Sequence, residues 1–163
     1  MATIDKRALI EKLREDIARS VSVLTRAAND AREAATHEEA KPENDKDTRA
    51  VEAAYLAGAQ ADRARDLERA SAALAALDLK RFGPDDAISA AALIALDQGD
   101  DESHWYFLAP QGGGLRAVIE GVEVQVITPQ APLGKELLGK SVGDTVEIRV
   151  QGKLRSYEIV QVA

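Results

Sequence analysis

Apolar and small residues recur at helical spacing through the first half of the chain. From Asp5 to about His37 there is neither Gly nor Pro, and such residues fill two positions of a heptad. They are Ile10, Ile17, Leu24 and Ala31 in one position, and Leu13, Ser20, Ala27 and Ala34 in the other. A second helical run, from about Lys46 to Leu79, carries Leu56, Leu67, Ala70, Leu74 and Leu77. The pattern predicts an antiparallel α-helical coiled-coil hairpin over residues 1–80, because pairing buries both apolar stripes.

After Lys80 the pattern changes to short runs typical of strands. RFGPDDA, residues 81–87, is typical of a linker, and six strand-like runs follow it. They cover residues 88–96, 104–109, 115–119, 122–127, 144–150 and 154–162. Between the fourth and fifth runs, Pro132 begins a short helical segment and Gly139 ends it. Residues 81–163 are therefore predicted to form a small α+β domain with a mostly antiparallel β-sheet.

The turn between the two predicted helices is strongly acidic. HEEAKPENDKD, residues 37–47, holds five carboxylates in eleven positions and is interrupted by Pro42. A solvated turn is one interpretation. The other is a cation site, because repelling carboxylates at the end of a rigid rod are costly unless a cation meets them. Mg²⁺ suits this second interpretation, since it takes one or two carboxylates and keeps waters or substrate phosphates.

Composition narrows the class of protein. The chain has 163 residues, 45% of them hydrophobic, a net charge of -7 and no cysteine. These values indicate a folded soluble protein in a reducing compartment, without a disulfide framework or a zinc ribbon. The acidic balance does not favour a large phosphate footprint on duplex DNA. No apolar run approaches the ~18 residues of a membrane span, so we expect a cytoplasmic protein with no membrane contact.

The residues of the second half resemble a known family. VITPQAPLGKELLGKSVGDTVEI, residues 126–148, is similar to the Ser-Pro-Leu/Ile-Gly-Arg-Ala-Leu-Leu-Gly-Lys motif, followed by Val-Gly-Asp, of the GreA/GreB transcription elongation factors. KLRSYEIVQV resembles the closing strand of that family. With the predicted hairpin and linker, the resemblance covers nearly the whole chain.

The resemblance implies a fold and a mode of action. It implies an FKBP-like C-terminal domain that docks at the rim of the RNA polymerase secondary channel, while the coiled coil enters the channel. The acidic tip would then help to hold the second catalytic Mg²⁺ of the polymerase, which cleaves backtracked RNA. The chain would have no cofactor of its own, would meet nucleic acid only through the elongation complex, and is expected to act as a monomer and not as an enzyme.

Two departures from the family pattern concern the site. The cleavage-active tip of the family reads Gly-Asp-Leu-Ser-Glu-Asn, and alignment places its glutamate on Glu43 but its aspartate on Ala40. Glu39, Asp45 or Asp47 would have to supply the second carboxylate. Gln130 stands where family members often have an acidic residue that contacts polymerase. We expect the partner-binding residues to be Thr128, Gln130 and Pro132.

Several functions remain open at this point. A cleavage factor would use Glu43 with its acidic neighbours at the metal, whereas a non-cleaving relative would place the same charge in the channel to inhibit or modulate synthesis. The FKBP-like fold also raises the possibility of a peptidyl-prolyl isomerase. It is a distant alternative, because that activity needs an apolar, aromatic-lined pocket for proline and this half of the chain has few aromatic residues. A coiled-coil adaptor for another complex is a further one. Catalysis by the chain itself lacks its usual parts, since there is no Cys and no GxSxG elbow.

Overall fold

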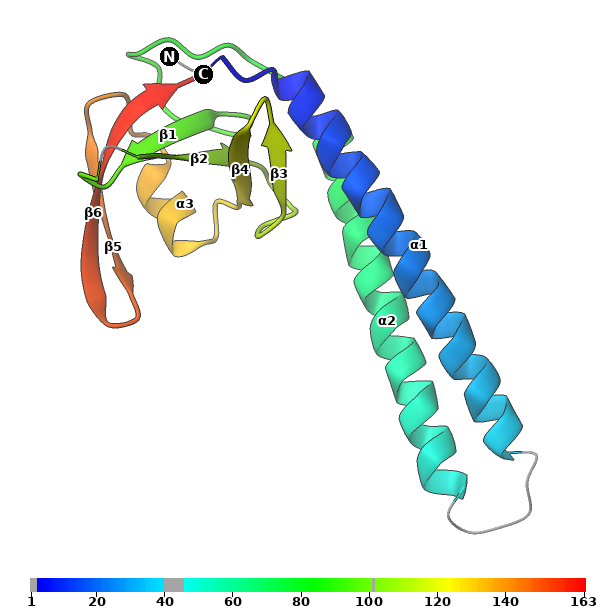
Figure 1. Ribbon diagram of the computed structural model, residues 1–163. Coiled ribbons are helices and arrows are strands. Elements are labelled where there is room, and N and C mark those ends of the chain that lie inside the picture. Colours follow the sequence, from blue (N-terminus) through cyan, green and yellow to red (C-terminus); the bar gives the residue numbers. More distant parts are fainter. Residues whose placement is uncertain (1–2, 40–45, 101) are drawn as a thin grey trace. The chain divides into compact units, whose positions relative to one another are not determined.

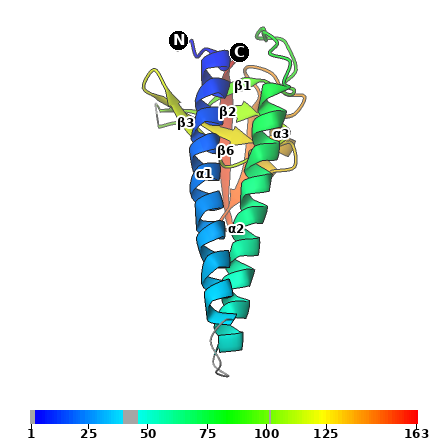
Figure 2. The same cartoon turned by 90° about the vertical axis from the view of Figure 1, so that its right-hand side faces the viewer.

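Two long helices dominate the N-terminal half of the protein. The computed structural model describes residues 3–39, 46–100 and 102–163. Helix α1 spans Lys6–Glu39 and helix α2 spans Lys46–Ala75. The two run antiparallel and side by side along their lengths (Figures 1 and 2). At 1.5 Å rise per residue, the 34 residues of α1 extend about 51 Å. The predicted helical hairpin is confirmed.

The buried stripe of α1 follows the predicted heptad only in part. Ile10, Leu13 and Ile17 are buried, but Ser20 and Ala34 are exposed, contrary to the prediction. Ala28 and Ala35 are buried in the second half of the helix instead. An α-helix has 3.6 residues per turn, so a stripe drifts about 20° per heptad against a strict seven-residue repeat. Over the two heptads from Leu13 to Ala27 the drift is about 40°, so the stripe turns toward the following residue, and Ala28 is buried while Ala27 is half-buried.

In α2 the buried stripe is built mainly from alanine. The buried residues of the helix recur at helical spacing and are Ala50, Ala57, Ala64, Leu67, Ala70 and Leu74. Leu56 was predicted to lie in the stripe, but its side chain is 52% exposed. Small side chains let two helix backbones approach closely, which favours Ala57 over its leucine neighbour at the contact. Near the base of the hairpin, Arg14 Nε donates to Ser71 Oγ at 3.2 Å, which fixes the antiparallel pairing there.

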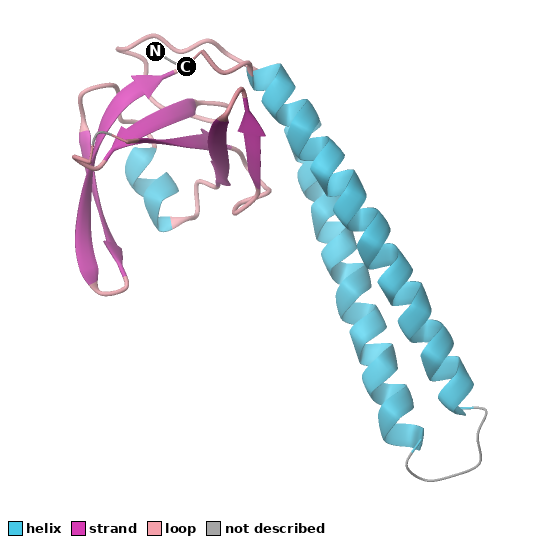
Figure 3. Ribbon diagram, in the orientation of Figure 1, coloured by secondary structure: helices cyan, strands magenta, loops and turns pink. Residues whose placement is uncertain are grey.

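A six-stranded sheet forms the C-terminal half (Figure 3). Its strands are β1 Leu93–Asp97, β2 Ser103–Leu108, β3 Arg116–Ile119, β4 Val122–Ile127, β5 Thr145–Val150 and β6 Lys153–Val162. The spatial order is β3-β4-β2-β1-β6-β5, and every neighbouring pair is antiparallel except β2 with β4. The predicted class, a helical hairpin followed by a small, mostly antiparallel domain with a short helix, is therefore confirmed.

One predicted strand begins later than the sequence indicates. Residues 88–92 form a turn, in which Ala91 has a φ of 70° and Ala92 N donates to Ser89 O at 3.1 Å. Ile88 is nevertheless 2% exposed and packs in the core of the domain. The backbone of the segment bonds to two other segments, because Ile88 N donates to Lys140 O at 2.8 Å and Ala91 N donates to Leu108 O at 2.8 Å. Burial of Ile88, Ala91 and Ala92 explains the apolar sequence, although the segment is a turn and not a strand.

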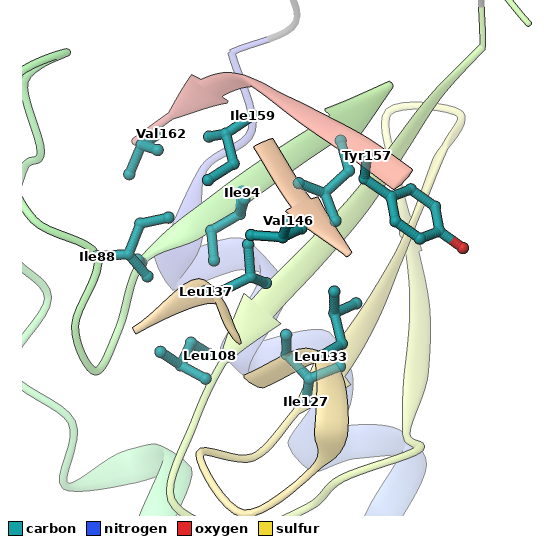
Figure 4. Close-up of a cluster of buried hydrophobic side chains, with 12 residues drawn as sticks. Ile88, Ile94, Leu108, Ile127, Leu133, Leu137, Val146, Tyr157, Ile159 and Val162 are labelled. Carbon is teal, nitrogen blue, oxygen red and sulfur yellow. The ribbon is translucent and has the colours of Figure 1, made fainter. Parts of the chain in front are cut away.

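Helix α3, Pro132–Leu137, completes the core of the domain. Its Leu133 and Leu137 join Ile94, Leu108, Val146 and Ile159 in one apolar cluster (Figure 4). Gly139 follows the helix with a φ of 80°, a left-handed conformation that favours glycine, as expected for the predicted helix stop. The cluster holds α3 against the sheet and so fixes the turn that precedes it.

By its contacts the chain divides into two compact units. One is Glu15–Ala70, and the other combines Met1–Arg14 with Ser71–Ala163. The base of the hairpin thus belongs with the sheet. The division after residue 80, with independent folding on each side, stays a prediction.

Candidate functional site

The acidic turn joins the ends of the two long helices. Helix α1 ends at Glu39 and α2 begins at Lys46. Glu43 and Asp45 lie outside the described residues, as do the side chains of Glu39 and Asp47. The structure therefore places the ends of the turn but not its carboxylates. Within the described part of the chain, no group of three acidic or histidine side chains is arranged to hold a metal ion.

The second candidate site is the turn between β4 and α3. Thr128 follows the last residue of β4, and Ala131 N donates to its backbone oxygen at 3.1 Å. Pro132 then opens α3, where its missing N–H costs nothing because the first turn of a helix has no partner for it. Three predicted contact residues, Thr128, Gln130 and Pro132, are thus brought together within one turn.

These three residues do not have the same exposure. Gln130 and Pro132 are exposed, whereas Thr128 is half-buried. The Thr128 methyl lies 3.1 Å from where a Cβ on Gly113 would stand, so this side chain packs against the 112–114 loop. Leu138, 41% exposed, adds an apolar side chain just after α3. On this turn, a partner can therefore reach Gln130 and Pro132, whereas the Thr128 side chain packs against the 112–114 loop.

A basic cluster at the base of the hairpin was missed by the sequence interpretation. Lys6 and Arg7 open α1, and Lys80 and Arg81 follow α2. The Lys6 ammonium donates to Lys80 O at 2.7 Å and lies 4.8 Å from the centre of the Phe82 ring. Burial lowers the pKa of Lys6 to about 8. The signal was present in the sequence as two Lys-Arg pairs, which an antiparallel hairpin brings together.

Comparison with known proteins bears on the C-terminal half most directly. Residues 119–163 match the family model described as transcription elongation factor, GreA/GreB, C-term. No helix in the described ranges is both long and apolar enough to cross a membrane.

Relatives align beyond that segment. The transcription elongation factor GreA of Mesorhizobium japonicum is 28% identical over 100 residues, which are 61% of this chain and 60% of the relative. The GreA of Rickettsia prowazekii is 29% identical over 152 residues, or 93% of this chain and 79% of the relative. The first of these alignments thus spans less than two thirds of the relative. Among solved structures, Gfh1 of Thermus aquaticus is 17% identical, with a TM-score of 0.38 over 93% of this chain and 92% of that one. The match of residues 119–163 and the alignments with GreA relatives confirm that the chain resembles the GreA/GreB transcription elongation factors.

Proposed function

We propose that this protein is a Gre-like regulator of transcription elongation that binds RNA polymerase through its secondary channel and stimulates cleavage of backtracked transcripts. The observation that carries the proposal is the GreA/GreB match of residues 119–163, extended by a GreA relative along 93% of the chain. The proposed partner is bacterial RNA polymerase in the cytoplasm. The protein would be an accessory factor, with the bond cleavage performed by the polymerase.

Two parts of the molecule support separate tasks. The exposed Gln130 and Pro132 lie on a turn that α3 and the core hold in place, which suits a docking surface. The acidic turn follows a helix of 34 residues, which suits delivery of charge to a distant site. Docking and chemistry would then depend on different residues.

The proposed chemistry rests on Glu43. A Mg²⁺ ion in the polymerase active site supplies electrostatic stabilisation of the phosphoryl oxygens during hydrolysis. Glu43, with Glu39, Asp45 or Asp47, would provide carboxylate oxygens to that ion, which is their ordinary ligand chemistry. The chain itself contributes negative charge and its placement.

A second candidate is favoured by one residue. Ala40 stands where the cleavage-active family tip has an aspartate, so the turn lacks one carboxylate. A non-cleaving relative would bind in the same way and use the remaining charge to inhibit or modulate synthesis.

Transcript cleavage in a halted, backtracked elongation complex tests the proposal. Wild-type protein should accelerate cleavage, and Glu43→Gln should abolish the acceleration while retaining binding to the polymerase. Glu52→Gln is the matched control, because Glu52 lies on the exposed surface of α2. Binding without any stimulated cleavage would reject the cleavage mechanism and support the second candidate. Failure to bind polymerase would reject both.

A further inference from the structure

A cleft of about 870 Å³ lies at the base of the hairpin. It is lined by residues 3–7, residues 79–82 and Ala163, all within one compact unit of the chain. Three segments far apart in sequence therefore converge on it. Its size is within the roughly 300–1,000 Å³ range of small-molecule sites.

Positive charge dominates the lining of this cleft. Lys6, Arg7, Lys80 and Arg81 all contribute to it, and Asp5 provides the one lining carboxylate side chain. Asp5 Oδ1 already accepts a hydrogen bond from Arg7 N at 2.8 Å, so it caps the start of α1. Across the described ranges, none of the four cations forms an ion pair with a carboxylate. The lining therefore carries an excess of positive charge even with Asp5 counted, and a bound anion would offset it.

Lys6 is held in position in the lining of the cleft. Its ammonium is fixed by the 2.7 Å hydrogen bond to Lys80 O and by the Phe82 ring. Burial makes its charge costly, which is why its pKa falls to about 8. An anion beside Lys6 would offset that cost. Preorganised cations of this kind bind anions with less loss of side-chain freedom than mobile surface lysines do.

The shape and chemistry of the cleft indicate which anion it fits. Arginine binds phosphate through paired, charge-assisted hydrogen bonds, and lysine adds a point charge. Ile4 is buried, and Leu79 and Phe82 are half-buried beside the cations, so the cleft also offers apolar surface. An extended nucleic acid is less suited, because the chain carries a net charge of -7.

We propose that this cleft binds the phosphate groups of a small anion, of the class of nucleoside polyphosphates. Arg7, Lys80 and Arg81 would contact the phosphates beside Lys6, and Leu79 and Phe82 would face the organic part of the ligand. The proposal does not depend on polymerase binding, since neither the acidic turn nor the β4–α3 turn takes part in it.

Binding of ATP to the full chain, measured by titration calorimetry without Mg²⁺, tests the proposal. The informative variant is Lys80→Gln with Arg81→Gln, because both side chains are exposed and their loss leaves the core intact. Affinity for ATP should fall about tenfold or more through loss of charge-assisted contacts. The matched control is Lys153→Gln with Arg155→Gln, an exposed Lys and Arg elsewhere in the domain, which should bind ATP as wild type does.

Two further probes distinguish the sources of phosphate. Inorganic tripolyphosphate should bind more weakly than ATP if the apolar surface takes part, and equal binding would restrict the site to the phosphates alone. A single-stranded oligonucleotide that bound more tightly than ATP through Lys80 and Arg81 would overturn the small-ligand proposal. Absence of binding by ATP and tripolyphosphate, or equal weakening in the two double variants, would overturn the site itself.

Discussion

Gly134 in the first turn of α3 stands against the backbone carbonyl of Thr128. A Cβ built on Gly134 would lie 2.9 Å from the carbonyl carbon of Thr128 and 3.3 Å from Pro129 Cα, and still closer to the Thr128 oxygen. The obstacle is backbone, which cannot move aside as a flexible side chain can. Glycine at this position therefore allows the chain to pass directly from β4 into α3.

Gly134→Ala should destabilise the domain. The added methyl would push α3 outward and pull Leu133 and Leu137 from the core, at a cost of about 2 kcal/mol or more. The measurement is urea unfolding followed by the fluorescence of Trp105, which lies in β2. Gly58→Ala in α2 is the control with the opposite expectation. Nothing lies within 4 Å of its added Cβ, so the helix should gain about 0.5–1 kcal/mol. An unchanged midpoint for Gly134→Ala would show that α3 relaxes freely.

The stripe of α2 yields a second matched pair of substitutions. Leu67 is 5% exposed, so Leu67→Asp places a charge at the helix contact and should cost at least about 3 kcal/mol. Leu56 is 52% exposed, so Leu56→Asp should leave stability nearly unchanged. Circular dichroism at 222 nm reports on the long helices, and Trp105 fluorescence reports on the sheet. Loss of helix signal in Leu56→Asp alone would mean that the stripe is wrongly placed.

Leu56 also shows how far sequence reasoning reaches. Heptad spacing predicts that both helices exist and pair antiparallel, because an apolar stripe must be covered. It ranks residues by hydrophobicity, however, and so selects Leu56 over Ala57, although Ala57 is 1% exposed. Which residue faces the partner depends on helix drift and on how closely two backbones approach. Both quantities depend on the whole of α2 and on the helix it packs against, so the sequence around Leu56 does not determine them.

The second half of the chain shows a similar limit. The sequence predicts the number of strands and the stop at Gly139, since alternation and turn residues are local signals. It does not predict the turn at residues 88–92, where a mostly apolar run turns back at Ala91 instead of continuing as a strand. At the candidate sites, the sequence predicts that Thr128, Gln130 and Pro132 share one turn. It does not distinguish the half-buried Thr128 from the exposed pair, because that difference arises from the neighbouring 112–114 loop.

The lowered pKa of Lys6 predicts a pH dependence of stability. Because this pKa is about 8 in the folded protein and 10.5 in the unfolded chain, the unfolded chain binds more protons between these values. The cost of burying the charge is fully present below pH 8 and disappears as pH rises to 10.5. Stability should therefore rise over this window by about 1 kcal/mol, after allowance for screening of a half-exposed group. Lys6→Met keeps much of the side-chain packing, and the wild-type rise relative to this variant isolates the Lys6 contribution. An equal pH profile in both proteins would reject the assignment.

Docking to polymerase should depend on the turn before α3. Replacing Gln130 and Pro132 by alanine should weaken polymerase binding about tenfold, as expected for loss of central contact residues. Pro84 and Gln98 are exposed elsewhere in the same domain, so their double alanine variant is a control of the same composition. Binding should be measured against core polymerase with both variants at equal thermal stability. Equal affinities would show that the contact surface lies elsewhere.

Ala40→Asp separates the two proposed mechanisms most sharply. This change restores the acid that the family tip carries three residues before its glutamate, which is Glu43 here. Two carboxylates at that spacing across a turn are able to share one Mg²⁺ ion, so cleavage should rise if the turn acts at the metal. The rate of transcript cleavage in a backtracked complex is the measurement, at two or more Mg²⁺ concentrations. A factor with one ligand too few needs more metal, so the wild-type rate should depend more steeply on Mg²⁺ than the variant rate.

The possible results distinguish three interpretations of the acidic turn. If wild type is inactive and the variant cleaves, the protein is a non-cleaving relative whose turn lacks one ligand. If both bind polymerase and slow synthesis without cleaving, the carboxylates act by occupying the channel. If changes of charge at Glu39, Glu43, Asp45 and Asp47 leave every transcription assay unaltered, the turn is a solvated loop, because carboxylates that meet a metal cannot be neutralised without effect.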